Sequence, residues 1–194
     1  MKLYYSPGAC SLSPHIALHE AGLKFDIEEV DLVTKKTKTG ADYSKINAKG
    51  SVPALQLDNG QVLTEAAVVA QYIADQKPEA NLMQRAGSTE RYRALEWLNY
   101  VATEVHKGFA PLWSDTTPDS YKQTVKENLA RKFAYLDKAL AGKKFLLGDQ
   151  FSVADGYLFT ILGWTKFMNM TLDAYPNLTA YLVRIAGRPA VQTA

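Results

Sequence analysis

The periodicity of this chain changes near residue 80, and this change constrains the fold more than any other feature. Strand and helix signals alternate over the first 76 residues, whereas the rest of the chain shows helical periodicity only. A chain of 194 residues is long enough for two modest domains with sizeable cores. We therefore predict an α/β domain at residues 1–77, a linker at 78–87 and an all-helical domain at 88–194.

The first part of the pattern predicts a βαβ unit, a β-hairpin and a closing helix. A helix is expected at 14–20 with Ser13 as its N-cap, and the apolar spacing over 66–73 predicts another. Asp58-Asn59-Gly60 is a strong hairpin turn signal. The expected strands are 2–6, 25–32, 54–57 and 61–63. The order β-α-β-α-β-β-α, with the middle helix the least marked, predicts a mixed four-stranded sheet with helices packed on it.

The second part predicts four helices and no strand. The segment Ser152-Val153-Ala154-Asp155 is a capping box, so it begins a helix that continues past Gly163. The other three helices are expected at 92–113, 121–140 and 178–185.

Charge and composition exclude several classes of protein. The net charge is only +2, and basic residues are interleaved with acidic ones, so we expect no nucleic-acid partner. No apolar run reaches the ~18 residues of a membrane span, and residues 1–8 lack a signal-peptide core. We therefore expect a cytoplasmic protein without a membrane partner. Cys10 is the only cysteine, which excludes an intrachain disulfide and a multi-cysteine metal site.

Cys10 follows a strand and a Pro-Gly turn and directly precedes a predicted helix. A thiol at a helix N-terminus is stabilised as the thiolate, so this position predicts a lowered pKa. The alternative for a lone cysteine is a small buried side chain. The run Cys10 to Ser13 lacks a second cysteine, which excludes a dithiol redox site, whereas exchange with an outside thiol stays open.

Three further places offer contacts to a ligand. A cis Pro53 would expose the Val52 backbone, although an ordinary trans proline at an edge strand is the alternative. Glu65 begins a helix, where it pairs with a ligand amine or simply favours the helix dipole. Asn99, Thr103 and His106 recur at i, i+4 and i+7, which suits a cleft or a subunit seam as well as a solvated face.

Several segments spread over the whole chain resemble, in their order and spacing, the glutathione transferase superfamily, specifically its bacterial beta class. They are residues 1–12 (MKLYYSPGACSL), 50–55 (GSVPAL), 63–65 (LTE), 96–100 (EWLNY), 104–109 (EVHKGF) and 151–155 (FSVAD). The resemblance implies a thioredoxin-like N-terminal domain, an all-helical C-terminal domain, a homodimer, and glutathione as co-substrate without a metal.

The resemblance also implies which residues bind glutathione. Val52, beside a cis Pro53, would pair with the cysteinyl part, Glu65 and the Ala66 N–H would hold the γ-glutamyl group, and Lys35 would face the glycine carboxylate. Cys10 would lie next to the glutathione sulfur. The site would be completed by Asn99, Thr103, Glu104, Val105 and His106. Many family members carry a serine where this chain has Ala66, so one hydroxyl contact of about 1 kcal/mol is absent while the backbone donor remains.

The implied activity is detoxifying transfer of glutathione to a small hydrophobic electrophile. Cys10 and His106 are the expected catalytic residues, and the electrophile pocket is expected at Lys107, Phe109, Trp113 and Trp164. Cys10-dependent disulfide exchange and reductive dehalogenation are related activities. Tyr5 and Ser11 are rival thiol activators, because other classes use a tyrosine or serine. A glutathione-binding or transcription-associated protein without turnover is the alternative function.

Overall fold

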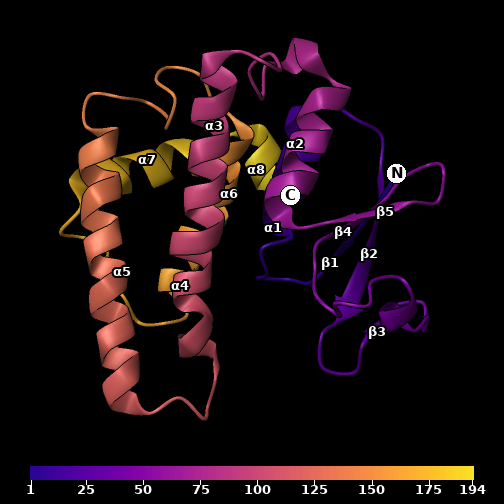
Figure 1. The fold of residues 1–194 in the computed structure, drawn as a ribbon, viewed down its shortest axis with the longest axis horizontal. Helices are drawn as coiled ribbons and strands as arrows, with labels where there is room; N and C mark the ends of the chain where they lie inside the picture. The colour runs from indigo at the N-terminus through magenta and orange to yellow at the C-terminus, as the bar shows by residue number, and fades with distance from the viewer.

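A mixed five-stranded sheet forms one end of the molecule and a group of helices forms the other (Figure 1). The computed structural model describes all residues, 1–194. The strand order is β3-β2-β1-β4-β5, in which β1 and β2 are parallel and the other neighbours are antiparallel. The strands are β1 (Lys2–Tyr5), β2 (Asp26–Asp31), β3 (Lys36–Thr37), β4 (Ala54–Gln56) and β5 (Val62–Thr64).

Eight α-helices accompany the sheet, and six of them follow residue 88. They are α1 (Leu12–Glu20), α2 (Ala66–Gln76), α3 (Thr89–Tyr100), α4 (Lys107–Phe109), α5 (Asp119–Leu140), α6 (Val153–Leu162), α7 (Pro176–Ala186) and α8 (Pro189–Thr193). The expected α/β part followed by helices is confirmed. Two details differ: the two-residue strand β3 makes a fifth strand, and the middle helix is a single 3-10 turn, Tyr43–Lys45.

The two faces of the sheet pack against different parts of the chain. Successive side chains of a strand point to opposite faces. Leu3 of β1 and Leu55 of β4 therefore lie in a core of 36 buried residues shared with α1, α2 and α6. Tyr4 and Ala54 point the other way, into a small cluster with Tyr43. The sheet thus has a large core on one face and a small buried cluster on the other.

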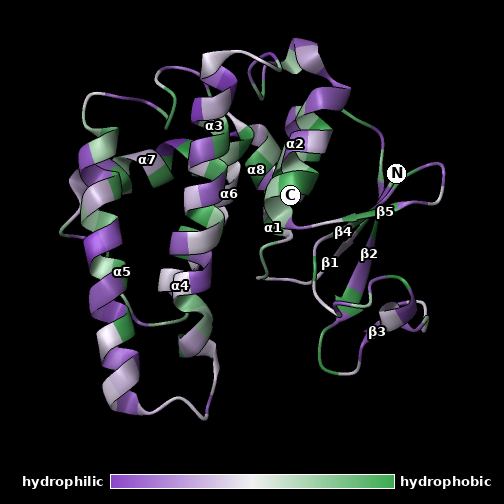
Figure 2. Cartoon of the chain, viewed as in Figure 1, coloured by the Kyte–Doolittle hydropathy of each residue, from purple (hydrophilic) through white to green (hydrophobic).

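Helix α6 lies at the centre of the molecule and is apolar along most of its length (Figure 2). Its start is the capping box predicted from the sequence, with Ser152 and Asp155 bonded to each other's backbone. The Asp155 carboxylate also accepts from the Leu146 N–H at 2.8 Å and the Tyr181 hydroxyl at 3.0 Å. This buried network fixes where α6 begins.

One helix start and the type of one long helix differ from the sequence prediction. Helix α1 begins at Leu12, with Ser11 at the N-cap position, while the hydroxyl of Ser13 is buried without a hydrogen-bond partner. The long helix expected at 92–113 is continuous but changes type, since a π-helix (Val101–His106) separates α3 from α4 and a 3-10 turn ends it. The π-helix shifts the phase of every side chain that follows it.

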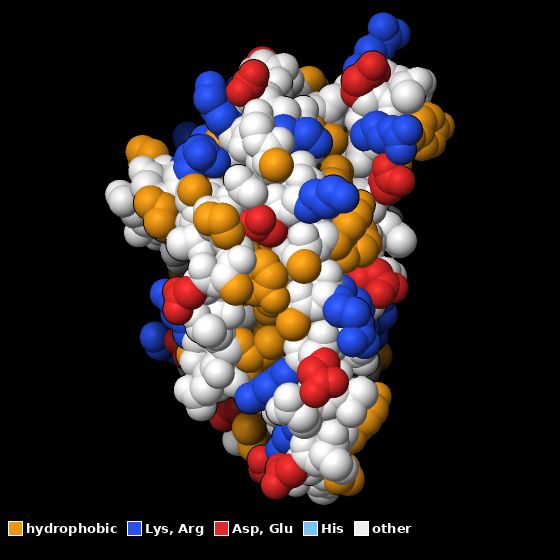
Figure 3. All heavy atoms as spheres, turned by 90° about the vertical axis from the view of Figure 1, so that its left-hand side faces the viewer, with side chains coloured by type: hydrophobic (Ala, Val, Ile, Leu, Met, Phe, Trp, Pro, Cys, Tyr) orange, Lys and Arg blue, Asp and Glu red, His pale blue; other side chains and the backbone are white.

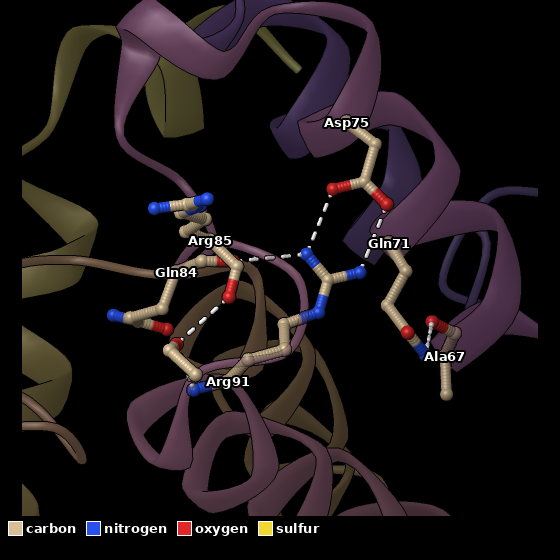
Figure 4. Close-up of polar contacts among 7 residues, drawn as sticks. Ala67, Gln71, Asp75, Gln84, Arg85 and Arg91 are labelled. Carbon is tan, nitrogen blue, oxygen red and sulfur yellow. Dashed lines mark hydrogen bonds and ion pairs between the residues drawn. The ribbon is translucent and has the colours of Figure 1, made fainter.

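Two ion pairs join the sheet end to the helical end. Arg91 of α3 binds both carboxylate oxygens of Asp75 on α2, at 2.7 and 2.8 Å, and the Gln84 carbonyl at 3.1 Å (Figure 4). Arg188, next to α8, binds Glu20 at the end of α1. No helix combines the length and hydropathy that spanning a membrane would require.

Candidate functional site

Cys10 lies in the turn between β1 and α1, and its side chain is buried. Its Sγ donates a hydrogen bond to the Val52 carbonyl at 3.2 Å. Burial raises the pKa of the Cys10 thiol to about 11, and the nearby Glu65 charge raises it further. The lowered pKa predicted from the helix N-terminus is therefore wrong for the unliganded protein, because desolvation outweighs the helix dipole. Cys10 is a thiol at neutral pH.

The backbone beside Cys10 has the form that the resemblance implied. The Val52–Pro53 peptide bond is cis, and Val52 precedes strand β4, which lies between β1 and β5. Lys35, between β2 and β3, is exposed, and its Nζ donates to the Gly50 carbonyl at 2.7 Å. The exposed Lys35 cation and the Val52 N–H, which has no hydrogen-bond partner, thus flank one end of the Cys10 turn.

Glu65 occupies the N-cap position of α2 with φ of 70°, in the left-handed region where side chains are rarely found. Its exposed carboxylate forms an ion pair with Lys49 at 2.5 Å, and the hydrogen bond from Lys49 lowers the pKa of Glu65. Ala66, the first residue of α2, is buried but leaves its N–H at the helix start. A strained backbone at a helix N-terminus next to an open carboxylate is typical of a ligand site.

His106 ends the π-helix and points towards α6. Its Nδ1 lies 2.6 Å from the Tyr157 hydroxyl, and its ring packs edge-on against Trp164 with centroids 4.9 Å apart. Burial lowers the pKa of His106 to about 4, and the Lys107 charge lowers it further. The imidazole is therefore neutral at physiological pH.

The other predicted residues of this helix do not share the position of His106. Asn99 and Thr103 are exposed, and the Thr103 hydroxyl donates to the Asn99 carbonyl at 3.0 Å. Glu104 forms an ion pair with Lys132 of α5 at 2.8 Å, whereas the Val105 side chain is fully buried. The π-helix rotates His106 relative to Thr103, so His106 is half-buried while Asn99 and Thr103 are exposed. Because its side chain is buried, Val105 can contact a ligand only through its backbone.

An apolar cleft of about 390 Å³ opens beside the Cys10 turn. Two of the predicted aromatic residues, Trp113 and Trp164, line it, and the Trp164 indole donates to the Gly8 carbonyl at 2.8 Å. Its complete lining is Ser6, Pro7, Gly8, Ala9, Leu32, Trp113, Trp164 and Phe167. The lining is mainly apolar and aromatic, which suits a small apolar molecule.

Two residues expected in that pocket lie elsewhere. Phe109 is fully buried behind Trp164 and packs on Phe133, because the apolar face of α4 turns towards α5. Lys107 is exposed and is absent from the cleft wall. Its charge lowers the pKa of Cys10, Glu65 and His106.

The rival activators Ser11 and Tyr5 do not face the cleft. The Ser11 hydroxyl is buried and bonds to the backbone of Ser6 at 3.2 and 3.3 Å. The Tyr5 ring packs against His15 on α1. Ser11 therefore holds the turn that carries Cys10.

Sequence reasoning missed three residues of this region. Lys49 directly precedes the Gly50–Leu55 segment, Phe167 stands three residues after Trp164, and Tyr157 is the one hydroxyl-bearing aromatic residue of α6. No local pattern distinguishes Tyr157, because α6 also carries the polar residues Asp155 and Thr160. No group of three or more His, Cys, Asp or Glu side chains is arranged to hold a metal ion.

Comparisons with known proteins agree with this geometry. The family model of the glutathione S-transferase N-terminal domain matches residues 8–76, and that of the C-terminal domain matches residues 100–189. Glutathione S-transferase GstA of Escherichia coli O157:H7 is 46% identical over 194 residues, which cover 100% of this chain and 96% of GstA. The chain belongs to the glutathione S-transferase family.

Solved structures identify the branch of the glutathione S-transferase family. A sphingomonad glutathione S-transferase, solved in complex with glutathione, is 47% identical with a TM-score of 0.97, and the match covers 100% of this chain and 96% of that one. The bacterial beta-class enzyme of Sphingomonas chungbukensis is 48% identical with a TM-score of 0.96 and the same coverage, 100% and 96%. The beta-class resemblance seen in the sequence is confirmed.

Proposed function

We propose that this chain is a glutathione transferase that binds glutathione across Val52 and the start of α2 and transfers it to a small hydrophobic electrophile. The observation that carries the proposal is the juxtaposition of the Val52 N–H beside a cis proline, an anion at Glu65 and an apolar cleft on the other side of the Cys10 turn. The peptide backbone of glutathione would pair with Val52, and its ammonium group would bind Glu65. Its nucleophilic sulfur would then lie beside the apolar cleft. A relative of 47% identity was solved with glutathione bound.

The binding mode follows from the charges. The cysteinyl backbone pairs with the Val52 backbone, which lies outside the strands just before β4. The γ-glutamyl ammonium binds Glu65 in competition with Lys49, and the γ-glutamyl carboxylate binds the Ala66 N–H at the start of α2. Lys35 faces the glycine carboxylate, and the exposed side of residues 99–106 closes the site.

The transfer step needs a glutathione thiolate. The neutral His106 is a hydrogen-bond donor to that anion, and the Cys10 thiol becomes a second one when its proton turns from the Val52 carbonyl to the glutathione sulfur. The thiol proton of glutathione leaves to solvent, the sulfur forms a bond to the electrophilic carbon, and the bond to the halide or other leaving group breaks with its electron pair. Trp113, Trp164 and Phe167 bind the apolar body of the electrophile.

Disulfide exchange requires a different state of Cys10. Its thiol must first lose a proton; the thiolate then attacks a glutathione disulfide, forms a mixed disulfide and releases one thiolate. Because burial holds the pKa of Cys10 at about 11, we place conjugation first and disulfide exchange second. Reductive dehalogenation would use the sulfur atoms of Cys10 and of glutathione.

The parts of the chain divide this work. We propose that residues 1–77 bind glutathione, that 78–87 form the linker, and that 88–194 supply the aromatic wall of the electrophile cleft and part of a homodimer seam. Exposed Tyr92, together with the packed aromatic group Trp97, Tyr100 and Tyr135 on α3 and α5, supports such a seam. Figure 3 shows hydrophobic side chains gathered in a strip on the side of α5, between charged side chains of both signs.

A lone free thiol fits a reducing cytoplasm.

Two assays on the wild type, Cys10→Ser and Cys10→Ala test the function. With glutathione and an activated aromatic halide, we expect turnover by the wild type, near-wild-type turnover by Cys10→Ser and partial loss in Cys10→Ala, since His106 and backbone donors remain. With a glutathione disulfide, both variants should be inactive, and only the wild type should gain the mass of one glutathione. Absence of turnover in the wild type together with tight glutathione binding would favour the binding protein instead.

A further inference from the structure

Tyr157 on α6 is a buried residue whose hydroxyl contacts the catalytic region. Only 2% of Tyr157 is exposed, and its Oη lies 2.6 Å from His106 Nδ1. The two rings meet edge to face with centroids 5.8 Å apart. His106 is the one hydrogen-bond partner of this hydroxyl, so the direction of the bond decides how both groups are satisfied.

The direction of the bond follows from the protonation states. Burial raises the pKa of Tyr157 well above its ordinary value, so the phenol keeps its proton. A neutral imidazole has one donor nitrogen and one acceptor nitrogen. If Nδ1 of His106 carried the proton, the buried Tyr157 proton would have no acceptor, which is costly. The hydroxyl therefore donates to Nδ1, and the imidazole proton resides on Nε2.

A second contact holds the imidazole in this orientation. Trp164 packs edge-on against His106 at 4.9 Å, and its indole N–H is tied to the Gly8 carbonyl at 2.8 Å. Gly8 belongs to the turn that carries Cys10. The ring of His106 is thus fixed between α6 and the Cys10 turn, with Nε2 as its one free nitrogen.

We propose that Tyr157 is a positioning residue that fixes His106 in the Nε2–H tautomer, so that this N–H donates a hydrogen bond to the glutathione thiolate. This rests on the proposed function, in which the glutathione sulfur lies beside Cys10 and His106. The charged and titratable groups that act on this pair are Lys107, Glu65 on α2 and Cys10. A neutral, oriented donor stabilises the thiolate across the whole physiological pH range, because His106 does not titrate there.

The tautomer can be measured on the unliganded protein with Tyr157→Phe. Nitrogen chemical shifts of the three histidine rings report their tautomers, and the spectrum of His106→Gln assigns the His106 signals. We expect wild-type His106 to be almost purely the Nε2–H form and Tyr157→Phe to give a mixture, while His15 and His19 stay unchanged. Tyr181→Phe is the matched control, because it removes a buried hydroxyl bonded to Asp155, away from His106.

Kinetics and the thiol pKa of bound glutathione test the consequence. Tyr157→Phe should lower kcat about tenfold with KM for glutathione changed less than about twofold, and raise the pKa of the bound thiol by roughly one unit, as read from thiolate absorbance. Tyr181→Phe should change stability but neither quantity. An unchanged His106 tautomer, or a changed tautomer with kcat and thiol pKa unaltered, would overturn the proposal. A wild type that does not bind glutathione would contradict the proposed function instead, and the spectra of the unliganded protein would still decide the tautomer.

Discussion

At the scale of single residues, the protonation state of Cys10 separates conjugation from disulfide exchange. Because burial raises the pKa of the Cys10 thiol to about 11, from 9.0 for a free thiol, its thiolate fraction at pH 8 should be about a hundredfold smaller than that of a free thiol. Alkylation of the unliganded protein by iodoacetamide should therefore be slow at pH 8 and accelerate with a midpoint near pH 11. The rate is followed by intact-protein mass spectrometry.

The same protein unfolded in urea provides the control for this titration, since its thiol should titrate near 9.0. Cys10 is the only cysteine, so every added mass reports this one thiol. A midpoint below pH 8 in the folded protein would contradict the raised pKa of Cys10. It would support instead the lowered pKa that its position at a helix N-terminus predicts.

Local sequence predicts the positions of the site residues along the elements better than it predicts their burial and protonation. Cys10 was predicted at a strand-turn-helix junction, where it lies, but its burial depends on Val52, which is distant in the chain. Phe109 is expected in the cleft from the sequence and Phe167 is not, because tertiary packing decides which side of each segment meets solvent. The role of Tyr157 depends on a contact across 51 residues, which no local pattern contains.

At the scale of elements, the start of α6 depends on Asp155. This carboxylate accepts four hydrogen bonds, from the Ser152 N–H and hydroxyl, the Leu146 N–H and the Tyr181 hydroxyl. Asp155→Asn keeps one acceptor oxygen and sets an NH₂ against buried donors, so we expect a loss on the order of 2–4 kcal/mol in the free energy of unfolding. Urea denaturation measures it. Asp119→Asn, in the first turn of α5, should have a small effect, and equal stability of the two variants would refute the role of the cap.

The elements themselves were largely predictable, because their signals are local. The hairpin, the capping box and the apolar stripes of α2 and α5 all appear where the sequence indicated. The π-helix Val101–His106 and the two-residue β3 were not predictable, because each is stabilised by packing or pairing with other segments. The π-helix is also the reason that His106 turns inward while Thr103 remains exposed.

At the scale of the whole molecule, the proposed seam predicts a homodimer. Sedimentation at low micromolar concentration should give a species of twice 21.5 kDa. Tyr92 is 64% exposed on α3, within the expected seam, so Tyr92→Arg should shift the distribution towards monomer. Val183→Arg, at an exposed position on α7, is the matched control and should remain dimeric. A wild type that sediments only as a monomer would refute the proposed dimer interface.

Glutathione binding at the start of α2 is the central claim, and calorimetry on Glu65→Ala tests it most directly. Loss of a charge-assisted contact to the ligand ammonium should cost about 1.5–3 kcal/mol, which raises the Kd of glutathione roughly 10- to 150-fold. Folding should change by less than about 1 kcal/mol, because Glu65 contributes to the fold only through the helix dipole and an exposed pair with Lys49. Glu79→Ala, which breaks the comparable exposed pair with Lys77, should bind glutathione like the wild type. Equal affinities of the wild type and Glu65→Ala for glutathione would show that the site lies elsewhere.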